Sequence, residues 1–315
     1  MQSELTDQKN IRIVFMGTPD FAVASLDILV QNGYNVVGVI TAPDKPAGRG
    51  LQLQQSAVKQ YAVSKGLRVL QPEKLKNPEF LEELRSLKAD LQVVVAFRML
   101  PEVVWDMPPL GTINVHASLL PNYRGAAPIN WAIINGEKQS GVTTFKLQHE
   151  IDTGDILFSQ SVDIRDDETA GDLHDNLMAT GAGLLLKTVQ ALASGTATGT
   201  PQAHIRAEDI KHAPKIFKED CQIKWEQPVE QIYNLVRGLS PYPTAWTTLN
   251  GKGLKIFKAT REQATPSVAP GQVISDNKTY LKIAAADGYL SLLEIQLEGK
   301  KRMDIEAFLR GNKIN

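Results

Sequence analysis

The chain has 315 residues, a net charge of −1 and a hydrophobic share of 43%, which exclude a disulfide-stabilised peptide and a strongly charged binding protein. A single cysteine, Cys221, cannot form an internal disulfide, so we expect a reducing compartment, the cytoplasm. No apolar run approaches the roughly 20 residues that a membrane span needs, so no membrane association is expected.

The first part of the chain alternates strand and helix patterns. Residues 1–10 are polar and are predicted to form a disordered tail. Apolar runs over 11–16 and 36–40 read as buried strands, and helical spacing fills 21–31 between them. This order predicts a parallel sheet with helices on its faces. The turn at Gly17 lacks the G-x-G-x-x-G spacing, so no dinucleotide fingerprint is present.

The segment 41–53 is rich in proline, glycine and cations and is predicted to be a mobile arm, although a solvated connection is equally compatible. Further along the chain, the patterns predict helices over 58–65 and 78–87. The run 91–97 is the clearest central strand.

The segment 111–128 carries the strongest chemical signal. A short strand places Asn114 and His116 on one face, with Cα atoms roughly 6.5–7 Å apart, before Pro121 ends it. A carboxamide can stabilise an oxyanion, and an imidazole can move a proton. The pair therefore indicates carbonyl chemistry.

A second polar cluster, Asp152-Thr153-Gly154-Asp155, lies between predicted strands over 141–147 and 156–162. Two aspartates around Thr-Gly can be simple turn chemistry. The alternative is that one carboxylate faces His116. A long amphipathic helix is predicted over 173–192.

Beyond residue 205 the pattern changes to short alternating strands separated by Asn-Gly, Pro-Gly and Asp-Gly turns, after one helix over 229–239. This predicts a small β-barrel or sandwich. The strands are expected at 222–225, 245–249, 254–257, 271–274, 280–283 and 290–295. From residue 205 onward, 17 Lys and Arg residues face 13 Asp and Glu residues, which fits nucleic-acid contact or an ordinary solvated surface.

Several segments of the chain carry a family resemblance: the two polar clusters, the Gly17-Thr-Pro-Asp-Phe turn, the 43–50 loop and the Arg124-Gly-Ala-Ala-Pro segment. Together they resemble the formyltransferases and hydrolases that use 10-formyltetrahydrofolate. The resemblance covers nearly the whole chain. It implies an α/β fold: a Rossmann-like parallel-sheet formyltransferase domain over 11–203, a linker over 204–212, and an OB-like tRNA-binding β-barrel over 213–315.

Within that family, the resemblance implies that Asn114 donates to an oxyanion on the formyl group and that His116 moves a proton to the leaving nitrogen. Asp152 would orient His116 and help to deprotonate the attacking amine. The formyl donor, 10-formyltetrahydrofolate, is a co-substrate, and no metal is implied. The folate-contacting residues would be Ser118, Leu119, Leu120, Pro121, Val95 and Phe97.

The chain departs from the usual pattern at residues 96–101, which are one residue shorter and carry Arg98 where small or apolar residues are usual. That departure concerns the wall of the folate pocket. Ala117 also stands where glycine is common.

The resemblance further implies an initiator methionyl-tRNA partner, contacted by the arm and by the C-terminal domain. A monomer suffices for this scheme, and we expect the protein to be one. The implied contacts are Lys45, Arg49, Lys252, Lys255, Lys300, Lys301 and Arg302. Lys45 stands where arginine is usual, which favours a point-charge contact over a bidentate one.

The function implied is formyl transfer from 10-formyltetrahydrofolate to the amino group of initiator methionyl-tRNA. Alternatives are formyl transfer to a small amine and hydrolysis of 10-formyltetrahydrofolate. A non-catalytic RNA-binding module is a further class, and the intact Asn114, His116 and Asp152 argue against it.

Overall fold

The computed structural model describes residues 9–47, 52–202 and 207–314. The chain divides into two compact units. Unit 1 takes the residues up to Arg124 with Gly141–Val162 and Asp175–His212, and unit 2 takes Gly125–Ser140, Asp163–His174 and the residues from Ala213 onward. The tail expected over 1–10 lies mostly outside the described residues, and the contiguous domain boundaries drawn from the sequence stay predictions.

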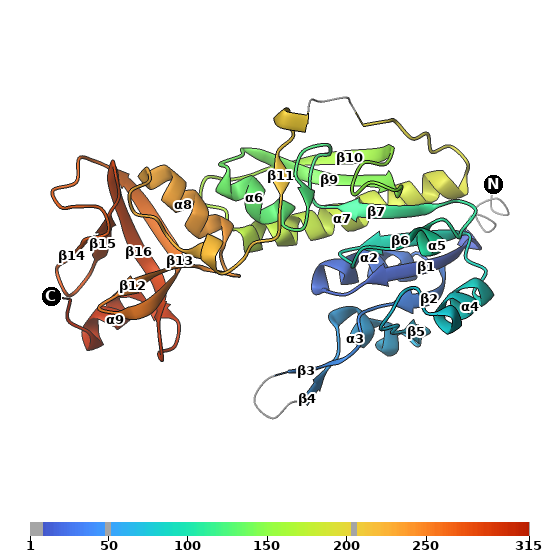
Figure 1. The fold of residues 1–315 in the computed structure, drawn as a ribbon, viewed down its shortest axis with the longest axis horizontal. Coiled ribbons are helices and arrows are strands. Elements are labelled where there is room, and N and C mark those ends of the chain that lie inside the picture. Colours follow the sequence, from blue (N-terminus) through green and yellow to red (C-terminus); the bar gives the residue numbers. More distant parts are fainter. Residues whose placement is uncertain (1–8, 48–51, 203–206, 315) are drawn as a thin grey trace. The chain divides into compact units, whose positions relative to one another are not determined.

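Unit 1 is built on a seven-stranded sheet with the order β10-β9-β7-β6-β1-β2-β5 (Figure 1). The pairs β2–β5, β1–β2, β1–β6 and β6–β7 are all parallel, which confirms the predicted parallel sheet. Every residue of β6 is buried, as expected for a parallel strand covered on both faces. The bounds are β1 (Arg12–Gly17), β2 (Asn35–Ile40), β5 (Val69–Leu70), β6 (Leu91–Val95) and β7 (Thr112–His116).

The sheet is not parallel throughout. Strand β9 (Gln139–Lys146) pairs antiparallel with β7, and β10 (Ile156–Asp163) follows at the edge. Strand direction depends on the connection between strands rather than on hydrophobic alternation, so the sequence pattern did not reveal this reversal.

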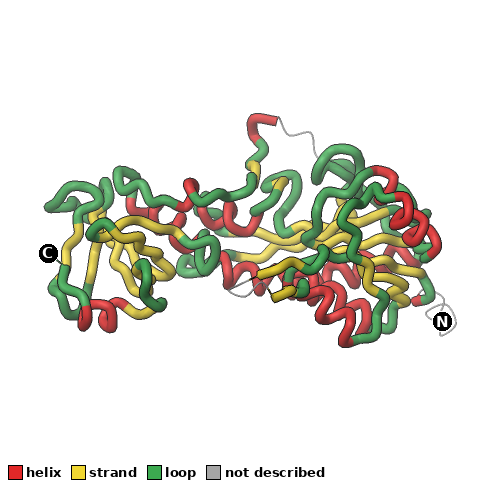
Figure 2. Tube along the Cα trace, turned by 60° about the horizontal axis from the view of Figure 1, so that its bottom comes forward, coloured by secondary structure: helices red, strands yellow, loops and turns green. Residues whose placement is uncertain are grey.

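Helices connect the strands, as the red and yellow segments of Figure 2 show. Two of them begin with side-chain caps: Ser56 accepts from the backbone N–H of Lys59, and Asn77 accepts from that of Glu79. Pro78 follows Asn77 at a position where its missing N–H costs nothing. The helices up to residue 193 are α2 (Asp20–Gln31), α3 (Ala57–Ser64), α4 (Pro78–Ser86), α5 (Glu102–Trp105), α6 (Pro128–Ile134) and α7 (Ala170–Ala193).

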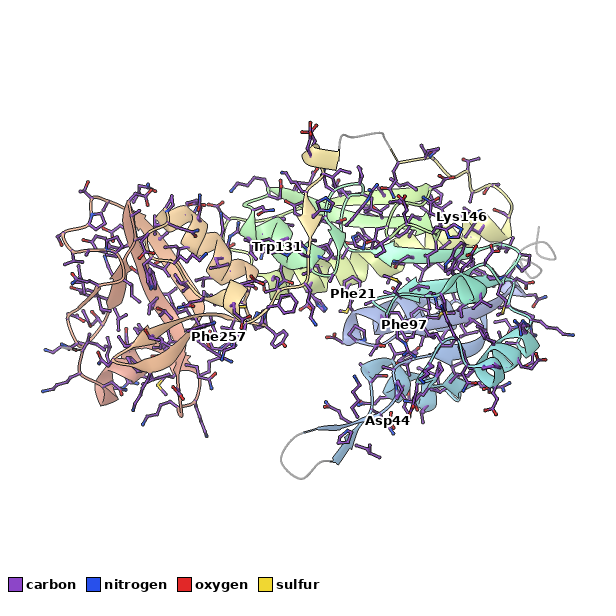
Figure 3. The ribbon with its side chains drawn as sticks, viewed as in Figure 1. Phe21, Asp44, Phe97, Trp131, Lys146 and Phe257 are labelled. Atoms are coloured by element: carbon purple, nitrogen blue, oxygen red, sulfur yellow. The ribbon has the colours of Figure 1, made fainter. Side chains whose placement is uncertain are left out.

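The arm predicted over 41–53 is more ordered than expected. Strands β3 (Lys45–Ala47) and β4 (Gln52–Gln54) pair antiparallel as a hairpin that projects from the sheet (Figure 1). At its base, labelled in Figure 3, Asp44 accepts hydrogen bonds from Lys59 at 2.5 Å and Gln71 at 2.7 Å. These two bonds hold the pKa of the Asp44 carboxyl below its usual value. The Thr41 and Ser56 hydroxyls, 2.7 Å apart, add a further link between the two sides of the base.

Unit 2 carries an antiparallel sheet with the order β12-β13-β16-β15-β14, and β17 pairs with β16. This confirms the β-rich C-terminal domain. Its apolar faces pack against the buried side of α8, where Val229 and Ile232 are fully buried. The elements are α8 (Val229–Gly238), β12 (Ala245–Leu249), β13 (Lys252–Gln263), β14 (Val273–Ser275), β15 (Leu281–Ala284), β16 (Gly288–Leu297), β17 (Met303–Asp304) and α9 (Ile305–Gly311).

Two details of unit 2 differ from the prediction. The strand expected over 222–225 is reduced to one isolated bridge between Gln222 and Trp246. Helix α9, which begins where Asp304 accepts from the backbone N–H of Ala307, was not predicted. Within the part of the chain that is described, no helix combines the length and apolar character needed to cross a bilayer.

Candidate active site

The carboxyl ends of β1, β6 and β7 meet at one edge of the unit 1 sheet, because the strands are parallel and in register. Gly17 is paired with Val95, and Val95 with Val115. Gly17 has no room for a side chain, since a Cβ there would lie 2.9 Å from the carbonyl oxygen of Val95. Ligands of open α/β sheets bind outside this edge. The edge is therefore where catalytic side chains are expected.

His116, the last residue of β7, is anchored through one of its ring nitrogens. It is 7% exposed, and Nε2 lies 2.8 Å from the carbonyl oxygen of Tyr123. A carbonyl oxygen only accepts, so Nε2 carries a proton and donates it there. Nδ1 consequently faces the other side, where Oδ2 of Asp152 lies 4.0 Å away. The ring also packs edge-on against Phe145 of the neighbouring β9.

Asp152 reaches His116 from the loop between β9 and β10. Its backbone has φ +55°, a left-handed conformation that is uncommon for a residue with a side chain. Two residues on, a Cβ at Gly154 would lie 1.6 Å from the carbonyl oxygen of Lys146, which ends β9 (Figure 3). The loop therefore passes so close to β9 that only glycine fits at 154. Of the two open readings of the Asp-Thr-Gly-Asp cluster, the structure favours the one in which a carboxylate faces His116.

Asn114 lies two residues before His116 on β7, which puts the two side chains on the same face of the strand. It is half-buried, and no group within the described ranges hydrogen-bonds to its carboxamide. Its N–H₂ group can therefore donate to an oxygen of a bound substrate.

The predicted folate segment follows directly. Ser118 is buried, donates from its hydroxyl to the carbonyl of Asn122 at 2.7 Å, and accepts at its own carbonyl from Thr143. Thr143 also accepts from the backbone N–H of Leu120. These bonds fix the backbone of this segment, in which Leu120 is buried and Leu119 and Pro121 are partly exposed.

The other predicted folate residues lie at the end of β6. Val95 is fully buried within the sheet, which leaves its backbone as the part that can face a ligand. Phe97 is partly exposed and follows Ala96, whose φ is +47° (Figure 3). Arg98 donates from its guanidinium to the carbonyl oxygens of Pro72 and Glu73. The arginine that marks this shortened segment therefore ties it to the 72–73 loop.

The predicted tRNA-contacting residues fall in both units. In unit 1, Lys45 is exposed on β3, and Arg49 lies outside the described residues. In unit 2, Lys252, Lys255, Lys300 and Lys301 are exposed, and Lys255 is opposite Gln296, whose amide donates to the carbonyl of Lys300. Arg302 is already engaged, because its guanidinium forms two bonds to Glu294 and lies over the ring of Phe257.

One residue of the site escaped the sequence reasoning. Gln202, in the segment after α7, donates from Nε2 to the carbonyl oxygens of Asp152 and Gly154 and accepts from Arg124. No local pattern marks it, since it is 50 residues from Asp152 along the chain. The preceding residues, Thr200 and Pro201, do not indicate a contact with Asp152.

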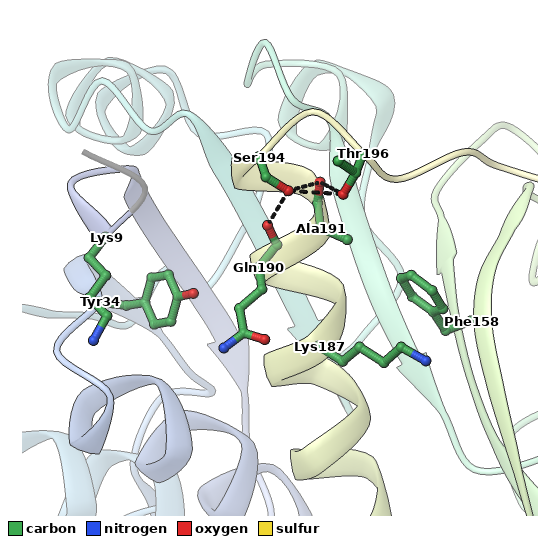
Figure 4. A pocket seen from close by; sticks show the side chains of 8 residues that line it. All are labelled: Lys9, Tyr34, Phe158, Lys187, Gln190, Ala191, Ser194 and Thr196. Carbon is green, nitrogen blue, oxygen red and sulfur yellow. Dashed lines mark hydrogen bonds between the residues drawn. The ribbon is translucent and has the colours of Figure 1, made fainter. Parts of the chain in front are cut away.

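A separate surface cavity of about 560 Å³ is formed around the C-terminal end of α7 (Figure 4). Lys187 lies 4.6 Å from the ring centre of Phe158 there, and the hydroxyls of Ser194 and Thr196 bond each other. None of Asn114, His116 and Asp152 lines this cavity.

Comparison with known proteins places this geometry in a family. Residues 9–189 match the model described as formyl transferase, and residues 215–313 match formyl transferase, C-terminal domain. A methionyl-tRNA formyltransferase of Parabacteroides distasonis is 59% identical over 97% of both chains. One from Flavobacterium johnsoniae is 51% identical over 96% of both chains.

Solved structures show the same fold at lower identity. HypX from Aquifex aeolicus, in complex with tetrahydrofolic acid, is 19% identical with a TM-score of 0.66, covering 97% of this chain and 49% of that one. An N-formyltransferase from Helicobacter canadensis, bound to folinic acid and dTDP-3-aminofucose, is 23% identical with a TM-score of 0.67, covering 93% of this chain and 100% of that one. The family models and the relatives above 50% identity settle the assignment: the chain belongs to the formyl transferase family, in its methionyl-tRNA formyltransferase group.

Proposed function

We propose that this protein transfers the formyl group of 10-formyltetrahydrofolate to the amino group of initiator methionyl-tRNA. The observation that carries the proposal is the meeting of Asn114, His116 and Asp152 at the carboxyl edge of the sheet, with Nδ1 of His116 facing the Asp152 carboxylate. The relatives above 50% identity are named for this reaction. They favour it over transfer to a small amine.

The reaction joins the amine nitrogen to the formyl carbon and breaks the bond from that carbon to N10 of the folate. The carbonyl oxygen carries negative charge in between. The carboxamide of Asn114, which has no partner in the described part of the chain, would donate to that oxygen. No covalent enzyme intermediate is needed, because the substrate amine is the nucleophile.

Protons must leave the attacking amine and reach N10. His116 and Asp152 supply a route, since Nδ1 and Oδ2 are separated by 4.0 Å, too far for a direct hydrogen bond. A water molecule or the substrate amine can bridge that distance. Nε2 stays bonded to Tyr123, so the proton exchange takes place at Nδ1.

The folate would lie along the segment from Ser118 to Pro121 and against Val95 and Phe97. The hydrogen bonds of Thr143 and Arg98 hold both walls in place. Walls fixed by the protein's own contacts are typical of small-molecule sites.

The tRNA would be bound by exposed cations on both units. Lys45 would act from β3, and Lys252, Lys255, Lys300 and Lys301 from unit 2. Arg49, which lies outside the described residues, is proposed as a further contact from its place in the sequence alone. Arg302 is the weakest of the predicted contacts, because Glu294 already neutralises it. We further propose that the protein acts as a monomer in the cytoplasm, where charged tRNA and reduced folate are available.

The test is an acid-urea gel that resolves formylated from unformylated methionyl-tRNA. Initiator and elongator methionyl-tRNA are incubated separately with the protein and 10-formyltetrahydrofolate, and a third reaction omits the tRNA. We expect a shift for the initiator alone. Tetrahydrofolate release is measured alongside, and a fourth reaction replaces the tRNA with a small amine. Release without tRNA or amine would instead identify a hydrolase, and release only in the fourth reaction would identify the small-amine enzyme.

A further inference from the structure

His116 and Asp152 belong to a closed network of contacts. On one side, Nε2 of His116 donates to the carbonyl of Tyr123, and the next residue, Arg124, donates from Nη2 to Oε1 of Gln202 at 2.6 Å. On the other side, Nε2 of Gln202 donates to the carbonyl of Asp152 at 2.7 Å. The carboxylate of Asp152 returns to His116 at 4.0 Å.

Within this network, Gln202 is the residue that hydrogen-bonds to the backbone of the 152–154 loop. Its single amide nitrogen donates to two carbonyls, those of Asp152 and of Gly154 at 3.0 Å. A neutral amide can do this because it offers two N–H donors and an acceptor at once. Glutamate has the same shape and keeps the acceptor, but it offers no donor when ionised.

The segment that carries Gln202 is itself fixed against the loop. Thr200 and Ile156 exchange two backbone hydrogen bonds of 2.8 Å. A Cβ at Gly199 would lie 2.9 Å from Cβ of Asp155, so the two segments run in close contact. Gln202 is thus presented to the loop from a rigid support.

The loop needs such support because its backbone is unfavourable by itself. Asp152 has φ +55°, and a left-handed backbone at a residue with a side chain costs roughly 1–2 kcal/mol, which contacts with its surroundings must offset. Of the two carbonyls that Gln202 binds, one belongs to the strained residue Asp152 and the other to Gly154, two residues on. Removing the donors would let Asp152 relax away from His116.

We propose that Gln202 is a positioning residue, which sets the separation between the Asp152 carboxylate and Nδ1 of His116 by holding the 152–154 backbone and anchoring to Arg124. The inference rests on the function proposed above for His116 and Asp152. It concerns kcat rather than substrate binding, because Gln202 acts through Asp152.

The experiment replaces Gln202→Glu, which keeps the acceptor for Arg124 and removes both donors to the loop. Gln190→Glu, an exposed position on α7 (Figure 4), is the matched control for the charge change. We expect Gln202→Glu to lower kcat by about 10- to 100-fold, the range for a catalytic group displaced by about 1 Å, with KM values unchanged. Gln190→Glu should behave as wild type.

A double-mutant cycle separates positioning from general damage. In an Asp152→Asn background the Gln202→Glu change should have no further effect on the residual kcat, because its route through Asp152 is gone. Independent, multiplying losses would overturn the proposal. Gln202→Met serves as the second variant where Gln202→Glu does not fold.

A readout without turnover distinguishes this proposal from the proposed function. The ¹⁵N shifts of the His116 ring, assigned by their loss in His116→Ala, should change at Nδ1 in Gln202→Glu and not in Gln190→Glu. An unchanged Nδ1 signal would refute the positioning role even in an active enzyme. A changed signal in a protein that transfers no formyl group would refute the proposed function alone.

Discussion

Oδ2 of Asp152 lies 4.0 Å from Nδ1 of His116, and Asp152 holds that place with a backbone φ of +55°. The residue that completes the candidate site is therefore also one that strains the chain. Glycine adopts this conformation freely, so the aspartate is present for its carboxylate rather than for the fold. Strain of this kind is common where function dictates the residue.

Asp152→Gly and Asp152→Ala separate these two effects. Both remove the carboxylate, and we expect both to abolish nearly all transfer. Urea unfolding should nevertheless show the glycine variant about 1 kcal/mol more stable than the alanine variant, because only alanine pays for the left-handed backbone. At an ordinary position the alanine variant is the more stable of the two. If the alanine variant is also more stable than the glycine variant at position 152, the strained conformation is contradicted.

Gly154→Ala should be far more harmful than its single added methyl suggests. The new Cβ would lie 1.6 Å from the carbonyl oxygen of Lys146, so the loop must move. We expect about 1–3 kcal/mol of lost stability and a fall in kcat, measured by urea unfolding and single-turnover transfer.

Gly183→Ala is the matched control for Gly154→Ala. Gly183 lies within α7 with open space around its Cβ position, so alanine should stabilise the helix by roughly 0.5–1 kcal/mol and leave transfer unchanged. Equal effects at the two glycines would show that the close approach to β9 is not a constraint in solution.

Asn114→Ala tests the oxyanion role. Because the carboxamide has no bonding partner in the described part of the chain, its removal should leave the unfolding free energy unchanged while kcat falls about 10²–10³-fold. Asn176→Ala, on the exposed face of α7, should change neither. A large loss of stability in Asn114→Ala with normal kcat would assign this residue to the fold.

The pairing of Asn114 with His116 could be read from the sequence because it rests on the period of a strand, a local property. The parallel sheet followed equally from local patterns, such as the nearly continuous apolar run of β6, which is interrupted only by Gln92. The antiparallel pairing of β9 could not be read, since the direction in which a strand returns is decided by the whole fold.

Long-range contacts explain the remaining differences. Strand β10 and helix α7 lie between Asp152 and Gln202 in the sequence, and no residue next to Gln202 indicates that the two are in contact. The hairpin of the arm was hidden because Pro46 and the glycines that follow suggest a loop. Its pairing is stabilised from outside by Asp44, Lys59 and Gln71 at the base.

Asp166 in unit 2 makes a pH-dependent contribution to stability. Hydrogen bonds from Lys138 and Arg261 lower its pKa from 3.8 to about 2. A carboxyl with a depressed native pKa adds stability above its unfolded pKa and loses it as the pH falls through the native one. Thermal unfolding should therefore show wild type more stable than Asp166→Asn at pH 7, with the gap closing between about pH 4 and pH 2.

The neighbouring Asp167→Asn provides the comparison for Asp166→Asn. Asp167 is more exposed and lies 3.6 Å from Arg165, so its effect should be smaller. A wild-type advantage over Asp166→Asn that persists unchanged at pH 2 would exclude the ion pairs as its source.

The β3–β4 hairpin is proposed to meet the tRNA, and salt dependence tests this directly. Lys45→Ala and Arg49→Ala should raise KM for initiator methionyl-tRNA without changing KM for the folate. Each should also reduce the salt slope of log affinity by about 1 for a phosphate contact. Lys65→Ala, an exposed lysine just after α3, should leave the slope unchanged. The hairpin is anchored at its base by Asp44 and Lys59, so the substitutions should not unfold it. Unaltered tRNA kinetics in both variants would therefore exclude the arm from tRNA recognition.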